Sequence, residues 1–127
     1  MKKTLFAAAA LALLATGVAQ AADTLAKIKD TGSATMGVRE SSGALSYTLG
    51  DGKFAGFHVE LCQHVLADVQ KKLGLAKLDV KYQPVTSQNR IPLVQNGTVD
   101  IECGSTTNNA TRQKDVSFAV TTYVEEV

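Results

Sequence analysis

Apolar residues recur along this chain at two spacings, which predict alternating helices and strands. The clearest pattern lies at residues 58–73, where apolar positions fall at steps of three and four with polar residues between them. This is typical of an amphipathic helix, and Gly74 is expected to end it. Three shorter segments, at 34–38, 78–85 and 99–103, have the pattern of strands.

Capping and turn residues place the remaining elements. They predict a helix capped by Asp23 or Thr24 and closed by Gly32, a hairpin across 45–54, a helix from Thr86 or Ser87 to Asn96, a helical turn at 109–114 and a strand at 123–127. The order of these elements predicts an α/β fold with a mostly parallel sheet flanked by helices.

The first 21 residues have the three parts of a secretory signal peptide. Lys2 and Lys3 make the start positive, residues 5–15 are apolar, and Ala19-Gln20-Ala21 is a small-residue cleavage site. The apolar run is shorter than the roughly 20 residues of a membrane span. We therefore expect residues 1–21 to be removed on export to a bacterial periplasm, and 22–127 to form one domain.

Composition narrows the partners and leaves the cysteines open. A formal net charge of +1 argues against nucleic acid or an anionic membrane as the main partner. The periplasm permits a disulfide between Cys62 and Cys103, but their spacing does not decide whether they pair. Because Cys62 fits the apolar stripe of a predicted helix and Cys103 ends a predicted strand, we expect reduced or otherwise partnered thiols.

Two stretches rich in hydroxyl and amide side chains each lead to an arginine. Residues 86–89 precede Arg90, and residues 105–111 precede Arg112. A guanidinium holds a carboxylate through two parallel hydrogen bonds, and neighbouring hydroxyls add short ones. A lone arginine is most often a solvated surface charge, but two such stretches predict a ligand with two carboxylates.

The predicted topology brings these stretches together. Loops that follow the carboxyl ends of parallel strands meet at one edge of the sheet, where open α/β proteins bind ligands. Arg39 follows the first predicted strand, and the two hydroxyl-rich stretches follow the next two. Helix N-termini at Ser87 and near Asn109 are expected to add backbone donors to the same edge.

Several motifs resemble the periplasmic amino-acid-binding proteins of ABC importers, and most of all their glutamate/aspartate-binding branch. The resemblance covers essentially the whole mature chain. The matching motifs are VRESS at 38–42, GFHVEL at 56–61, TSQNRIPLVQNGTVD at 86–100, and ECGSTTNN at 102–109 followed by Arg112-Gln113.

The resemblance implies a role for each candidate residue. Arg112 matches the arginine that grips the ligand's α-carboxylate, and Ser105 and Thr107 match groups that help hold the α-carboxylate and the α-amino group. The residues matched to the side-chain carboxylate of an acidic ligand are Arg39, Ser87 and Arg90. The implied ligand is glutamate or aspartate, with no cofactor and no metal.

The resemblance also implies a larger assembly. Members of this family have two lobes that close over the ligand, and residues 22–127 match only the first lobe. The expected protein is monomeric when complete and delivers its ligand to an ABC permease in the inner membrane. The chain departs from the family at Ala44-Leu45, where Pro-Phe is common, and at His58, where Ser or Asp usually caps the helix.

Other functional classes are a dehydratase-like enzyme or a ligand-sensing module on the same fold. An enzyme needs a general acid over the pocket, and the three loops offer no evident His or Glu for that role. His58 and Cys62 share a helix face but lack a third metal ligand, and Asp100 and Glu102 lack a partner carboxylate. We therefore expect a binding protein and no enzymatic activity.

Overall fold

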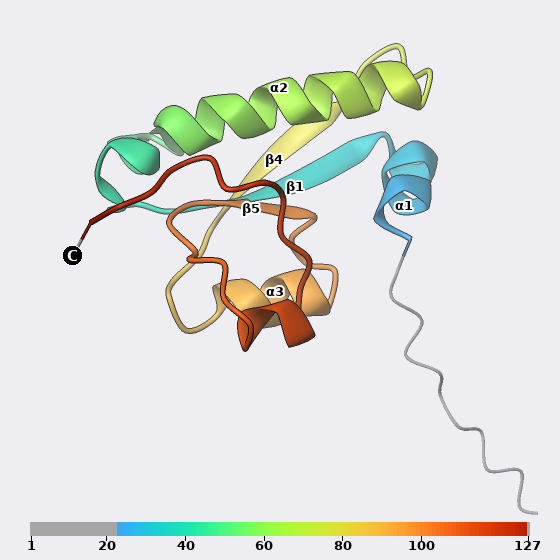
Figure 1. Cartoon of the computed structure of the whole chain (residues 1–127). Coiled ribbons are helices and arrows are strands. Elements are labelled where there is room, and N and C mark those ends of the chain that lie inside the picture. Colours follow the sequence, from blue (N-terminus) through green and yellow to red (C-terminus); the bar gives the residue numbers. More distant parts are fainter. Residues whose placement is uncertain (1–22, 127) are drawn as a thin grey trace, which may run out of the picture.

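A three-stranded parallel sheet forms the centre of the computed structural model, which describes residues 23–126 (Figure 1). β1 (Ser33–Val38) lies between β4 (Asp79–Pro84) and β5 (Ile101–Cys103). Met36 pairs with Tyr82 on one side and with Ile101 on the other. The α/β fold with a parallel sheet is confirmed, while the predicted signal peptide at 1–21 lies outside the described residues.

Two helices cover opposite faces of this sheet (Figure 1). α2 (Phe57–Lys72) runs along one face, and the short α3 (Arg90–Gln95) lies against the other. α1 (Thr24–Thr31) precedes β1; Asp23 caps it by accepting hydrogen bonds from two backbone amides, and Gly32 ends it in a left-handed conformation, as predicted. No helix within residues 23–126 is long and apolar enough to cross a membrane.

The hydrophobic core lies between α2 and the sheet. Alternate residues of β1 point toward α2, because successive side chains of a strand face opposite sides. The buried core residues are Ile28, Ala34, Met36, Val38, Val59, Cys62, Leu66 and Cys103. On the other face Gly37 leaves room for Val99, whose Cγ1 would lie 2.9 Å from any Cβ added there.

The hairpin is confirmed as β2 (Tyr47–Gly50) paired antiparallel with β3 (Lys53–Ala55). Its turn has positive φ at all three residues from 50 to 52, which two glycines accept at low cost. A 3₁₀ turn, η1 (Gly43–Leu45), connects β1 to this hairpin. These elements place the chain segment after Arg39 beside the N-terminus of α2.

The expectation that Cys62 and Cys103 are reduced or otherwise partnered is wrong. Cys62 of α2 and Cys103 at the end of β5 form a disulfide. The helix stripe and the strand end both face the same core, so the two residues that seemed separately buried meet there. The bond ties α2 to the point where the loop after β5 begins.

Two predicted boundaries are also wrong. α3 begins at Arg90 and not at Thr86 or Ser87. Thr86 and Asn89 exchange side-chain hydrogen bonds with each other's backbone amides at 2.7 and 3.2 Å, in the pattern of a capping box, and the Arg90 amide donates to the Thr86 carbonyl at 3.2 Å, so Thr86 opens the turn that leads into α3. Residues 123–126 of the predicted strand at 123–127 form no strand, and 127 lies outside the described residues. A strand needs a neighbour to pair with, and none lies beside this segment within residues 23–126.

Asp100 joins α1 to the sheet, and we expect its substitution to destabilise the fold. Its side chain is 3% exposed and accepts hydrogen bonds from Lys27 Nζ and the Thr35 amide, both at 2.8 Å. Asp100→Asn removes the charge from both bonds, so urea denaturation should show a loss of about 1 to 3 kcal/mol. The control is Asp68→Asn, whose exposed ion pair with Lys71 contributes little. Equal effects of the two substitutions would contradict this role.

Candidate functional site

Three loops meet at the carboxyl edge of the sheet, as the topology predicts. The last residue of β1, Val38, pairs with both Pro84 of β4 and Cys103 of β5, so the three strands end at the same level. The loops that follow them begin at Arg39, Val85 and Gly104. All six candidate residues lie on these loops or at the start of the elements that follow.

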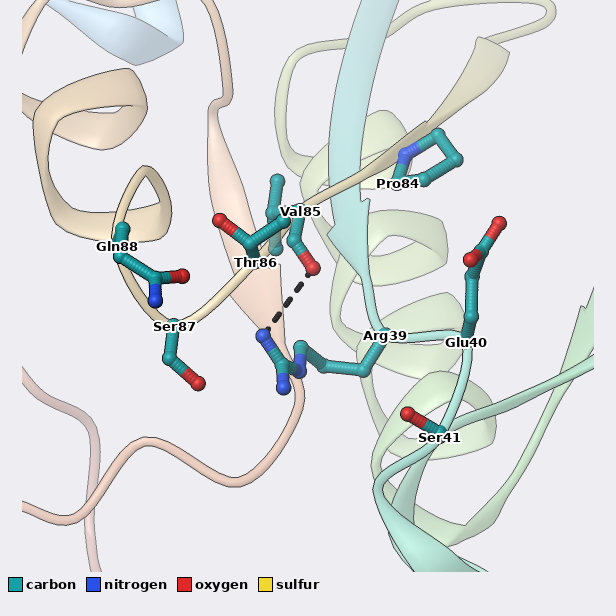
Figure 2. A pocket seen from close by; sticks show the side chains of 8 residues that line it. All are labelled: Arg39, Glu40, Ser41, Pro84, Val85, Thr86, Ser87 and Gln88. Atoms are coloured by element: carbon teal, nitrogen blue, oxygen red, sulfur yellow. Dashed lines mark hydrogen bonds between the residues drawn. The ribbon is translucent and has the colours of Figure 1, made fainter.

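Arg39 spans the space between the first two loops. Its Nη1 donates a hydrogen bond to the Val85 carbonyl at 3.2 Å, and its Nε donates to Ser42 Oγ at 3.2 Å. Figure 2 shows the guanidinium reaching from the end of β1 toward the loop that carries Ser87. Arg39 and Ser87 line a hollow of about 240 Å³ at this edge.

Arg90 is the first residue of α3, and its side chain is buried, with 7% exposed. Burial lowers the pKa of Arg90, the charge of Glu102 raises it, and the positive charges of Arg112 and Arg39 lower it. Arg39 and Arg112 therefore both lie within electrostatic range of Arg90. The buried Arg90 Nε makes no hydrogen bond to any described residue.

The loop after β5 positions the third arginine. Arg112 begins the 3₁₀ turn η2 (Arg112–Lys114), and its Nη1 donates to the Thr107 carbonyl at 2.9 Å. Its backbone amide donates to Asn109 Oδ1 at 2.9 Å. Thr107 thus contacts Arg112 through its backbone carbonyl. The predicted helical turn at 109–114 is confirmed only for its last three residues.

Ser105 connects this loop to the first one. Its hydroxyl and that of Ser42 are hydrogen-bonded at 3.0 Å, and Ser42 also accepts the bond from Arg39 Nε. The Ser105 side chain is exposed. This chain of polar contacts joins the loop after β5 to the loop after β1.

Five of the six candidates divide between two hollows. Arg90, Ser105 and Thr107 line a larger one of about 710 Å³, which is separate from the hollow of Arg39 and Ser87. Arg112 lies beside these residues and lines neither. The expected helix N-terminus at Ser87 is wrong, because Ser87 lies in the turn before α3.

Glu102 is a residue of this site that the sequence analysis did not select. Its Oε2 accepts a hydrogen bond from Thr106 Oγ1 at 2.8 Å, and its Oε1 is buried without a hydrogen bond to any described residue. The strand alternation of β5 places Glu102 opposite the buried Cys103, on the side of Arg90. That alternation, combined with the predicted position of Arg90, is the sequence pattern that would have identified it.

An α/β lobe with three arginines and several hydroxyls at the carboxyl edge of its sheet has the architecture of a solute-binding protein. Residues 34–127 match the family of bacterial extracellular solute-binding proteins, family 3. The chain belongs to this family.

Two curated relatives are especially similar. The chain is 58% identical to the L-glutamate/L-aspartate-binding protein of Pseudomonas aeruginosa over 99 residues, which cover 76% of this chain and 32% of the relative. It is 47% identical to the glutamate/aspartate import solute-binding protein of Escherichia coli strain K12 over 131 residues, which cover 98% of this chain and 43% of the relative. The chain therefore spans less than half the length of these relatives.

A solved structure supports the fold. The L-cysteine solute receptor of Neisseria gonorrhoeae superposes with a TM-score of 0.64 at 27% identity, covering 75% of this chain and 37% of that structure. The match is confined to about a third of the receptor, as expected for a single lobe.

Proposed function

We propose that this chain is the first lobe of the substrate-binding component of an amino-acid ABC importer, and that the ligand is glutamate or aspartate. The observation that carries the proposal is that Arg39 and Arg112 both lie within electrostatic range of the buried Arg90 at one sheet edge. Positive charges so close together repel one another, and a ligand with two carboxylates relieves that repulsion. The names of the two curated relatives support the same ligand class.

The proposed division of the site follows the order of the loops along the chain and not the two hollows, since Arg90 lines the larger hollow with Ser105 and Thr107. Arg112, Ser105 and Thr107 hold the α-carboxylate and the α-amino group, since all three belong to the loop after β5. Arg39, Ser87 and Arg90 surround the side-chain carboxylate, since they lie on the loops after β1 and β4 and at the start of α3. The buried Arg90 gives the strongest preference for a carboxylate, because water screens its charge least.

The proposed mechanism needs a second lobe. Ligand docks on the carboxyl edge of the sheet, and contacts from a second lobe then stabilise a closed state that an inner-membrane permease recognises. The protein acts in the periplasm after removal of residues 1–21 and is monomeric when complete. It binds its ligand without chemical change, and neither the dehydratase nor the sensor alternative is favoured by a feature of this site.

Binding by this chain alone is expected to be weak. The rim is open to water, where ion pairs contribute only ~0 to 1 kcal/mol each, so the dissociation constant for glutamate should be roughly millimolar or higher. In a chimera that continues residues 1–127 with the remainder of the Pseudomonas aeruginosa relative, glutamate should bind at least a hundred-fold tighter, on the order expected from burying the ligand. NMR titration of the chain and calorimetry of the chimera measure the two values.

Two outcomes would contradict the proposal. A chain that binds glutamate at micromolar concentration would show that one lobe suffices. A folded chimera that binds neither glutamate nor aspartate would exclude the ligand class. Incubation of the chimera with glutamate, aspartate and a cyclohexadienyl acid should return each compound unchanged, and turnover of any of them would favour the enzyme alternative.

A further inference from the structure

Glu102 lies among the arginines of the site, and the absence of a side chain at Gly104 allows it to do so. A Cβ built on Gly104 would clash with both Arg39 Cγ and Glu102 Oε1. Gly104 is not among the glycines with positive φ, so this position requires glycine for its small size and not for its backbone conformation. The stem of Arg39 and the carboxylate of Glu102 therefore pack against the same α-carbon.

The carboxylate is also close to Arg90. Among the charged groups that act on Arg90, Glu102 has the largest effect, ahead of Arg112 and Arg39. Glu102 and Arg90 line the same hollow of about 710 Å³. Arg90 Nε and Glu102 Oε1 are both buried without a hydrogen bond, so they are not bonded to each other. The two groups therefore interact through the electric field and not through a direct contact.

The orientation of the carboxylate is fixed by the loop itself. Thr106 donates its hydroxyl proton to Glu102 Oε2 at 2.8 Å, four residues along the chain. This bond leaves Oε1 directed into the buried space next to Gly104. A charge held in a buried position acts on its neighbours more strongly than one in water.

From this placement we infer that Glu102 is a specificity-determining residue, which sets the net charge of the arginine site and limits its preference for a carboxylate over an amide. Three guanidinium groups and one carboxylate leave two positive charges in the site. The proposed ligand has two carboxylates and one α-ammonium, whereas glutamine has one carboxylate and one α-ammonium, so the charge of the site bears directly on the choice between them. The inference rests on the proposed function. Without Glu102 the site carries a third uncompensated positive charge. This additional charge strengthens the attraction to a ligand carboxylate more than the attraction to the neutral amide of glutamine.

The test is the ratio of the dissociation constants for glutamine and glutamate, measured by calorimetry on the chimera. Glu102→Gln keeps the size of the side chain and an oxygen for Thr106 but removes the charge. The ratio should rise about 3- to 30-fold, the range given by one unit charge acting across several ångströms of partly screened space. A loss of structure alone would weaken both ligands together and leave the ratio unchanged.

The matched control is Thr106→Val, which removes the hydrogen bond and keeps the charge. It should weaken both ligands by similar factors and change the ratio less than twofold. Glu102→Met, neutral and of similar volume, repeats the test if Glu102→Gln does not fold. In either neutral variant, NMR titration of the unextended chain at millimolar ligand gives a second value of the ratio.

A ratio that stays constant or falls in a folded neutral variant would overturn the inference while leaving the proposed function intact, provided that the unsubstituted chimera binds glutamate. An unsubstituted chimera that is folded and binds no acidic amino acid would overturn both. A rise in Thr106→Val equal to that in Glu102→Gln would assign the effect to loop geometry and would also overturn the role of charge.

Discussion

Arg90→Met is expected to weaken glutamate binding by about 2 to 5 kcal/mol, or roughly 30- to 4000-fold, while affecting glutamine much less. Arg90 is buried at the start of α3. In the proposed site, its removal would leave the ligand's side-chain carboxylate without its least screened cation. Methionine retains an unbranched apolar stem, so the substitution removes charge and leaves little empty volume. Calorimetry of the chimera with both ligands measures the difference.

The control for this prediction is Lys114→Met, which removes an exposed cation from η2 near the same edge and should leave both affinities nearly unchanged. Thermal melts of both variants separate loss of binding from loss of folding. If glutamate and glutamine lose equal affinity in a folded Arg90→Met variant, Arg90 contacts the α-carboxylate or serves only the structure.

The disulfide should be the largest single contribution to stability. Cys62 and Cys103 are 41 residues apart in sequence, and closing a loop of that length in the unfolded chain is worth about 4 kcal/mol by chain entropy. Cys62→Ala combined with Cys103→Ala should lower the free energy of unfolding by about that amount. Urea denaturation of the two proteins gives the comparison.

A reductant provides the control. Dithiothreitol should lower the urea midpoint of the unsubstituted protein and have no effect on the double variant. Because Cys103 directly precedes Gly104, reduction should also loosen the loop that carries Ser105 and Thr107. A midpoint that does not move on reduction would show that the bond adds nothing to stability.

Local pattern was sufficient to predict most of the fold. The helical period at 58–73 and the apolar segments at 34–38, 78–85 and 99–103 correspond to α2, β1, β4 and β5. The parallel order follows from their alternation with helices, and parallel pairing in turn brings the loop residues to one edge. The positions of these helices and strands depend on which side chains are buried, and the spacing of apolar residues in the sequence records that.

The predictions that were wrong concern contacts between distant or irregular segments. The pairing of Cys62 with Cys103 depends on how α2 packs on β5. The residue pattern of α2 and that of β5 each predict burial, but neither predicts this packing. Thr86 caps the turn that precedes α3 through its reciprocal bonds with Asn89, as the sequence suggested, but the helix itself begins only at Arg90. Glu102 was dismissed for lack of a partner carboxylate, whereas its neighbours are arginines on other loops and Thr106.

The position of β1 in the sheet has a consequence for how the chain folds. β1 is the central strand, yet both of its partners come later in the sequence, since Met36 pairs with Tyr82 and with Ile101. Contacts between residues so far apart form slowly, because a long loop must close before any bond is made. A chain that emerges N-terminus first therefore cannot complete its sheet until residue 103 is available.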